Sequence, residues 1–172
     1  MLPARPSLSS LSLLLVCLCA GPLIAQEAEV ADIEYKNEVE LFVGGVTETE
    51  QSASGFGIGL EYNRRLSPRW SIGVEAVEIS TTDVTRSWLV VVPVYFHITE
   101  GLGIKAGPGI EGSKEEPEDG GESESTTEFV LRLGAGYEFE LGGRFTLTPE
   151  INADLIGGHV TWVYGLSFGV GF

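Results

Sequence analysis

Apolar residues alternate with small or polar residues along most of the chain after position 35. The last stretch, Val160 to Phe172, shows this most clearly: every second residue from Trp162 onward is large and apolar, and the residues between are small or polar, mostly glycine. A period of two residues is typical of a β-strand. The same period recurs in seven earlier stretches, and no helical period appears outside the N-terminal segment. Eight strands are predicted, over Asn37–Val46, Gly55–Arg64, Arg69–Glu78, Ser87–Ile98, Leu102–Glu111, Glu128–Glu140, Phe145–Leu155 and Val160–Phe172.

Polar loops and tight turns alternate between these strands. The expected loops contain TETEQSAS, ISTTDVTR, GSKEEPEDGGESEST and IGGH, and the expected turns contain RLSP, TEG and LGGR. Strands of about ten residues, even in number and joined alternately by short and long connections, are typical of outer-membrane barrels. The sequence therefore predicts an all-β fold, an eight-stranded antiparallel up-and-down transmembrane β-barrel, with both termini in the periplasm.

The position of the aromatic residues distinguishes this barrel from a water-soluble one, whose apolar face would fill the lumen. Aliphatic residues occupy the middle of the apolar faces, and aromatic residues occupy both ends. Such an arrangement matches two membrane–water interfaces, so the apolar faces are expected to contact lipid. The expected girdles are Tyr62, Trp70, Phe96, Tyr137, Phe139, Phe145 and Phe172 at the turns, and Phe56, Trp88, Phe129, Trp162 and Tyr164 at the loops.

The opposite faces carry glycines and most of the charged strand residues, and they are expected to line a narrow interior. A barrel of eight strands is just wide enough for side chains to fill. We expect an interior polar network of Glu61, Glu75, Lys105, Arg132 and Glu150, in which Arg132 pairs with Glu150. This network is interpreted as a plug, and the alternative is a narrow conduit that favours cations.

The N-terminal segment has the layout of a secretory signal peptide. Arg5 precedes an apolar run from Leu11 to Ala20, and small residues follow up to Ala25. The predicted organisation is a signal peptide over 1–25, a periplasmic lead-in over 26–35 and the barrel over 36–172. Both cysteines, Cys17 and Cys19, lie in the signal peptide, so the mature chain is expected to have no disulfide or thiol chemistry.

Charge and motifs exclude several function classes. The formal net charge of −15 argues against binding to nucleic acid, whose phosphates require Lys and Arg. No phosphate loop or zinc spacing occurs in the mature chain, so no cofactor and no metal are expected. The acidic segment from Glu111 to Glu128 is interpreted as a solvated loop. The two histidines, His97 and His159, do not suggest the Ser–His–carboxylate set of a lipid hydrolase, so no catalytic residues are expected.

The segments VYGLSFGVGF, VVVPVYFHIT followed by LGIKAGPGIEG, and FVLRLGAGYEF with its GGRF turn resemble those of the small porin-like outer-membrane β-barrel proteins. That family includes the transmembrane domain of outer-membrane protein A. The resemblance implies that the last strand carries the signal read by the outer-membrane assembly machinery, through Tyr164, Leu166, Phe168, Val170 and Phe172. Outer-membrane lipids and lipopolysaccharide are the other expected partners.

The expected function is that of an integral outer-membrane protein of a Gram-negative bacterium, with a plugged interior and a structural or surface-exposed role in envelope integrity or adhesion. A narrow porin-like channel for small solutes or cations is the alternative. A lipid-modifying enzyme of the outer membrane is a third class, favoured by no motif in the chain.

Overall fold

The chain folds into ten β-strands in the computed structural model, which describes residues 35–48, 54–81, 86–115 and 124–172. The predicted signal peptide and all but the last residue of the lead-in lie outside these ranges. In the described part of the chain, no helix is long and apolar enough to cross a membrane. The strands are β1 (Asn37–Glu48), β2 (Ser54–Ser67), β3 (Trp70–Thr81), β4 (Arg86–Val91), β5 (Val94–His97), β6 (Leu102–Glu115), β7 (Glu124–Tyr137), β8 (Phe139–Gly142), β9 (Phe145–Ile156) and β10 (His159–Gly171).

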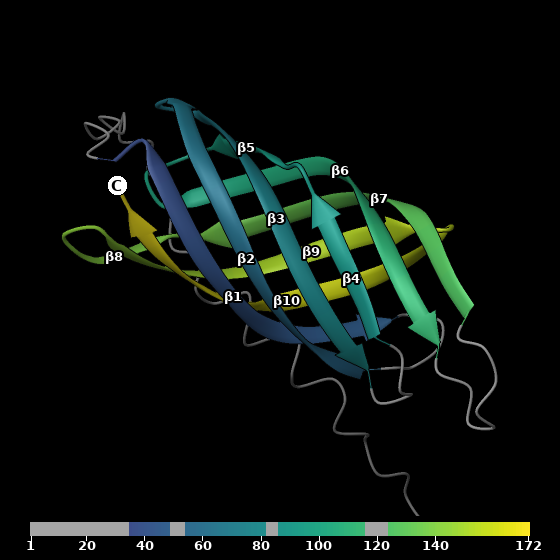
Figure 1. The fold of residues 1–172 in the computed structure, drawn as a ribbon. Coiled ribbons are helices and arrows are strands. Elements are labelled where there is room, and N and C mark those ends of the chain that lie inside the picture. The colour runs from purple at the N-terminus through teal and green to yellow at the C-terminus, as the bar shows by residue number, and fades with distance from the viewer. Residues whose placement is uncertain (1–34, 49–53, 82–85, 116–123) are drawn as a thin grey trace, which may run out of the picture.

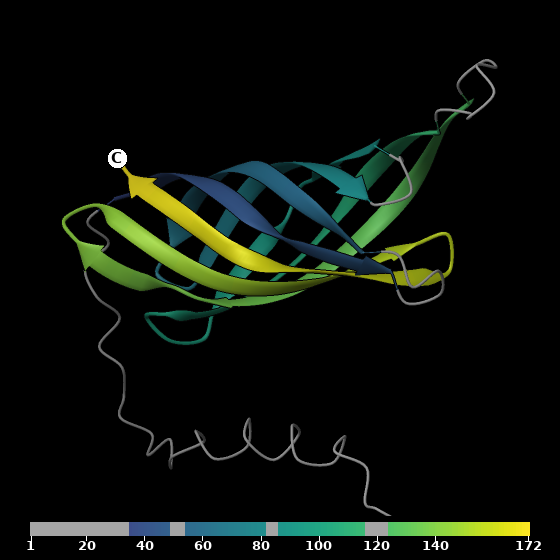
Figure 2. The same ribbon diagram turned by 90° about the horizontal axis from the view of Figure 1, so that it is seen from below.

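These strands form a closed antiparallel barrel (Figure 1), which confirms the predicted fold. Its wall has eight strand positions, which we call staves, because two of them are each occupied by two consecutive strands. Strands β4 and β5 form one stave between β3 and β6, and β7 and β8 follow one another along β9. The last strand, β10, pairs with both β9 and β1 and so closes the sheet (Figure 2). The main chain of Asn37 and that of Phe172 bond to one another in both directions, which brings the two ends of the barrel sequence together.

The predicted fourth strand is interrupted at Val92 and Pro93, because proline has no N–H to donate to the ladder. Ladder bonds continue on both sides of the break. The Val92 N–H donates to the Pro108 carbonyl at 2.9 Å, and the Gly73 N–H donates to the Pro93 carbonyl at 2.9 Å. The wall therefore stays closed where the strand is interrupted.

The two ends of the barrel differ in their connections. The turn end carries the β2–β3, β5–β6 and β8–β9 connections and the C-terminus, and the loop end carries the other four connections. One predicted loop is wrong: β9 and β10 are joined by only Gly157 and Gly158, with φ of 56° and 98°. Paired left-handed residues form the tight hairpin turns that match the twist of the strands.

Several strands extend further toward the loop end than the alternation predicted. Strand β3 continues to Thr81, and β6 and β7 pair from Glu111↔Glu128 to Glu115↔Glu124. The segment predicted as an acidic loop therefore begins and ends as strand. Ladder hydrogen bonding does not require an apolar face, so a hairpin can continue past the point where the alternation of side chains stops.

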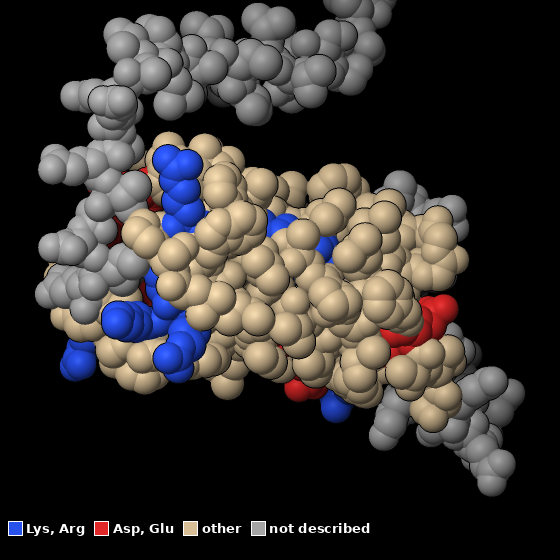
Figure 3. Space-filling model, turned by 90° about the horizontal axis from the view of Figure 1, so that it is seen from above, with Lys and Arg blue, Asp and Glu red and all other residues tan. Residues whose placement is uncertain are grey.

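Most of the large apolar side chains face outward along the wall. Trp70, Leu131 and Phe168 are exposed, whereas Glu75 and Arg132 are buried with 2% and 0% exposure. Of the predicted girdle residues, only Phe96 is half-buried, because its ring packs at 4.9 Å against that of Trp70. The wall in Figure 3 is mostly free of charge, with Lys and Arg gathered toward the turn end. The predicted assignment of the two faces is confirmed.

The interior is divided along the barrel axis. Its loop-end half is filled by a cluster of buried apolar side chains, which we call the apolar seal. The turn-end half is lined by charged and polar side chains. The seal consists of Phe42, Val46, Val77, Ile79, Leu89, Val91, Val130, Ile156 and Val163.

Candidate functional site

The polar half of the interior is organised around Arg132 on β7. Its Nε and Nη2 atoms donate to Asp154 Oδ1 at 2.7 Å and to Asp154 Oδ2 at 2.6 Å. Its Nη1 atom donates to Glu75 Oε1 on the other side of the barrel. A two-pronged pairing of this kind matches the planar guanidinium to a carboxylate. Arg132 therefore links β7, β9 and β3 across the interior.

The predicted pairing of Arg132 with Glu150 is wrong. In the β7–β9 register, Arg132 lies directly opposite Asp154, whereas Glu150 lies opposite Gly136. Side chains that are four residues apart along a strand are separated by about 13 Å. Arg132 therefore takes the carboxylate beside it, and Glu150 is left for another cation.

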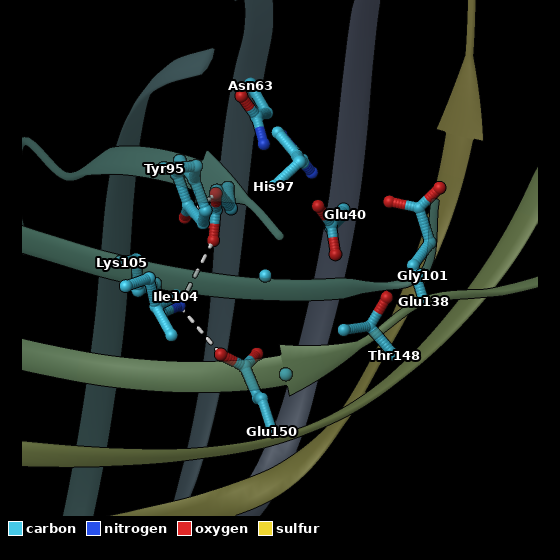
Figure 4. A pocket seen from close by; sticks show the side chains of 13 residues that line it. Glu40, Asn63, Tyr95, His97, Gly101, Ile104, Lys105, Glu138, Thr148 and Glu150 are labelled. Carbon is cyan, nitrogen blue, oxygen red and sulfur yellow. Dashed lines mark hydrogen bonds and ion pairs between the residues drawn. The ribbon is translucent and has the colours of Figure 1, made fainter. Parts of the chain in front are cut away.

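That cation is Lys105 on β6 (Figure 4). Its Nζ atom lies 2.6 Å from Glu150 Oε2, 3.4 Å from Glu75 Oε2 and 3.6 Å from Glu61 Oε2. The Tyr95 hydroxyl donates to Glu61 Oε1, and the ammonium of Lys105 lies 5.6 Å from the centre of the Tyr95 ring. Lys105 thus brings together Glu61, Glu75 and Glu150 of the predicted network, and Glu75 joins them to Arg132.

Neutral side chains complete the bonding of Glu150. Ser167 Oγ donates to Glu150 Oε1 at 2.6 Å, and Asn152 Nδ2 donates to Glu150 Oε2 at 3.1 Å. The sequence interpretation did not include Asp154, Tyr95, Asn152 or Ser167 in the network. All four lie on the inward-facing half of the alternation, so the period identified them as interior residues but not as partners.

The apolar seal lies directly on the loop side of these ion pairs. Val130 is two residues from Arg132 on β7, Ile156 is two residues from Asp154 on β9, and Val77 is two residues from Glu75 on β3. Each of these pairs shares the inward face, because side chains alternate along a strand. The ion pairs link the strands to one another, and the seal packs the interior on their loop side.

The interior also holds a Ser–His pair that the sequence analysis did not connect. Ser71 Oγ and His97 Nε2 are 2.8 Å apart near the turn end. A hydrolase needs a carboxylate on the other ring nitrogen and a serine that the substrate can reach. Ser71 is only 1% exposed, and in the described ranges no carboxylate bonds to His97. The pair therefore satisfies buried polar groups.

Comparison with known proteins identifies the family. The family model described as "Outer membrane protein beta-barrel domain" matches residues 11–172. The chain belongs to this family. Its strands are therefore membrane-spanning strands of an outer-membrane protein, in agreement with the outward-facing apolar wall. No curated protein matches the chain.

Solved outer-membrane barrels share the fold of this family member. The attachment invasion locus protein Ail of Yersinia pestis has 16% identity and a TM-score of 0.60, over 81% of this chain and 100% of that chain. Neisserial surface protein A has 12% identity and a TM-score of 0.67, over 80% and 97%. The N-terminal β-barrel domain of Pseudomonas aeruginosa OprF has 16% identity and a TM-score of 0.60, over 81% and 100%. At such identities the likeness concerns the fold alone.

The residues expected to form the assembly signal lie together on the outward face of β10. Tyr164, Leu166, Phe168 and Phe172 are exposed, and Val170 is half-buried. The Phe172 carbonyl accepts hydrogen bonds from the main chain and side chain of Asn37, at 3.2 Å and 3.3 Å. The Phe172 side chain itself stays on the outer surface.

Proposed function

We propose that this protein is a sealed outer-membrane barrel with a structural and surface-presenting role, which neither conducts solutes nor modifies lipids. The apolar seal carries this proposal. Nine apolar side chains fill the loop-end half of the bore, with exposures of 5% or less. An ion moving through such a region would lose its hydration without gaining polar partners, at a cost of many kcal/mol.

The ion pairs below the seal support the same reading. Arg132 and Asp154 are 0% and 1% exposed, and two nitrogen atoms of Arg132 donate to the two carboxylate oxygens of Asp154. A conduit would require these groups to separate in a medium of low dielectric constant, where breaking a buried pair costs about 3–5 kcal/mol. The network therefore acts as a brace between the staves.

A lipid-modifying role has less support. A substrate acyl chain would approach from the outer wall, where most of the described side chains are apolar. The Ser71–His97 pair faces the interior instead. Catalytic groups must lie within hydrogen-bond reach of the reacting atoms, and an interior serine of an outer-membrane barrel does not meet that requirement for lipid.

The surface-presenting part of the proposal rests on the loop end. The segment from Glu111 to Glu128, which includes the ends of β6 and β7 and the connection between them, contains eight Glu and Asp residues and a single Lys. It would give this end of the barrel a negative charge. Ail, which has the same fold, is an attachment invasion locus protein, and one of its structures is a complex with the heparin analogue sucrose octasulfate. The acidic connection of the present protein favours basic partners over a sulfated polysaccharide.

Planar lipid bilayer recordings test the proposal. Purified protein, shown to be folded by its heat-modifiable gel mobility, should insert without producing single-channel steps. A general porin added to the same bilayer serves as the positive control. Steady steps that scale with the amount of protein would contradict the seal and favour the narrow channel.

A further inference from the structure

The turn-end half of the interior contains an acidic cavity of about 50 Å³ (Figure 4). We call it the vestibule. Its wall includes Gly101 and Glu138, which lie in the β5–β6 connection and at the β7–β8 break, so it reaches the turn end. The apolar seal closes the other direction. The vestibule is therefore a blind site that faces the periplasm.

Negative charge in the vestibule exceeds the positive charge available to it. Glu40, Glu61, Glu138 and Glu150 line the cavity together with the single cation Lys105. The ammonium of Lys105 is bound to Glu150 and shared with Glu61 and Glu75. In the described part of the chain, neither Glu40 nor Glu138 forms an ion pair.

Two residues that line this cavity carry an acceptor with no donor among the described residues. Glu40 is 9% exposed, forms no hydrogen bond with a described residue, and directs its carboxylate into the vestibule (Figure 4). Asn63 Oδ1 is also buried without a hydrogen-bond partner. Buried polar groups are normally bonded, because an unbonded one costs free energy. Both the Glu40 carboxylate and Asn63 Oδ1 accept hydrogen bonds, so a ligand that satisfies them must supply hydrogen-bond donors.

We propose that the vestibule binds a small ammonium-type cation that enters from the turn end. An ammonium supplies the positive charge and the N–H donors that Glu40 and Asn63 require. The wall already holds one ammonium group, that of Lys105 at 2.6 Å from Glu150. Among the described residues, no cluster of three or more His, Cys, Asp or Glu side chains could hold a metal ion.

The size of the cavity sets an upper limit on the guest. One water molecule requires about 10–15 Å³ measured in this way, so about 50 Å³ accommodates a few waters or a guest such as methylammonium. Tetramethylammonium carries the same charge but has no N–H donor and is larger. The comparison of these two ions therefore separates specific binding from general screening by salt.

Calorimetric titration of the folded, full-length mature protein in detergent at pH 8 tests this inference. The probe is methylammonium chloride, compared with tetramethylammonium, sodium and magnesium chloride at matched ionic strength. Only methylammonium should give saturable binding and raise the midpoint of thermal unfolding. Equal effects of all four salts would overturn the proposal, and a response to magnesium alone would replace it with a metal site.

Substitutions then locate the site. Glu40→Gln should weaken methylammonium binding by about tenfold or more, because it removes a charged acceptor. Glu78→Gln, an exposed glutamate on the outer face of β3, is the matched control and should bind like the unmodified protein. Asn63→Ala is a second variant, expected to weaken binding while all carboxylates remain. Unchanged affinity in both vestibule variants would overturn the assignment. Conductance is a separate measurement, so a failure of the seal and a failure of this site can be told apart.

Discussion

Arg132 is the residue on which the interior of this barrel depends most. It is fully buried, and its guanidinium bonds to Glu75 on β3 and through two nitrogen atoms to Asp154 on β9. Removal of one member of a buried ion pair leaves the others charged and unsolvated. Its neighbour Lys105 bonds mainly to Glu150 and shares only Glu75 with it.

Replacement of Arg132 by methionine should therefore destabilise the folded barrel by about 3–5 kcal/mol. Equilibrium urea unfolding in lipid vesicles, followed by tryptophan fluorescence, measures the change. Arg144→Met, at an exposed position in the β8–β9 turn, is the control and should change stability by less than about 0.5 kcal/mol. Equal stability of the two variants would contradict the bracing role of the ion pairs.

Glycines on the inner face are not equivalent. A Cβ atom placed on Gly165 would lie 2.7 Å from Gly44 Cα and 2.7 Å from Phe42 Cε2, because the Phe42 ring packs over both glycines. A Cβ atom on Gly103 would lie 3.8 Å from its nearest neighbour, His97 Nδ1. The close approach of β1 to β10 therefore requires glycine at position 165, whereas position 103 has room for a small side chain.

Gly165→Ala should lower the free energy of unfolding by about 1–3 kcal/mol, the usual cost of overpacking. Gly103→Ala should leave it unchanged or raise it by up to about 1 kcal/mol, since alanine restricts the unfolded chain. The same urea titration compares the two variants. A larger loss at Gly103 than at Gly165 would show that the packing around Phe42 is described incorrectly.

At the scale of strands, the alternation of side chains predicted which face of each stave is inside. It could do so because one residue of slippage would turn every apolar side chain from lipid into the bore. The alternation alone does not predict which of the inward-facing side chains bond to one another. Counting outward from the turn at Gly143 places residue 154 opposite residue 132, which is the pairing found in the structure. The contact between Arg132 and Glu75 crosses the barrel, so it depends on the closed shape and not on local register.

Strand ends were predicted least well. The alternation stopped at Glu78 and Leu155, yet β3 and β9 continue and place Ile79 and Ile156 in the apolar seal. The sequence predicts both isoleucines to lie in loops, because polar or glycine residues follow them. The sequence does not predict the seal, because the seal forms only when inward-facing residues of six staves come together in the closed barrel.

The final strand offers a test of the predicted assembly signal. Phe172→Ser should lower the amount of protein found in the outer membrane of cells, while the stability of protein folded in vitro changes by less than about 1 kcal/mol. The backbone bonds between Phe172 and Asn37 do not involve the ring, so closure of the barrel is retained. Phe139→Ser, at another exposed aromatic position, on β8, is the control. Equal membrane levels of the two variants would show that Phe172 has no role in recognition.

At the scale of the whole molecule, three different surfaces are arranged along and around one axis. The outer wall is mostly apolar, the loop-end half of the interior holds the apolar seal, and the turn-end half holds the acidic vestibule. An apolar wall is stable only in contact with hydrocarbon, because water would make its exposed surface unfavourable. Contact with the membrane therefore accounts for the apolar side chains of the outer surface, and the narrow interior accounts for the tightly packed side chains of the inner surface.

The three tryptophans test this account most directly. Trp70, Trp88 and Trp162 all lie on the outer wall, the first near the turn end and the others near the loop end. Variants that keep one tryptophan and carry phenylalanine at the other two positions are folded into vesicles with brominated phospholipids. We predict strong quenching of each tryptophan, greatest with bromine near the lipid headgroup. Fluorescence that is insensitive to brominated lipid but quenched by iodide in the water would contradict the outward placement of the apolar face.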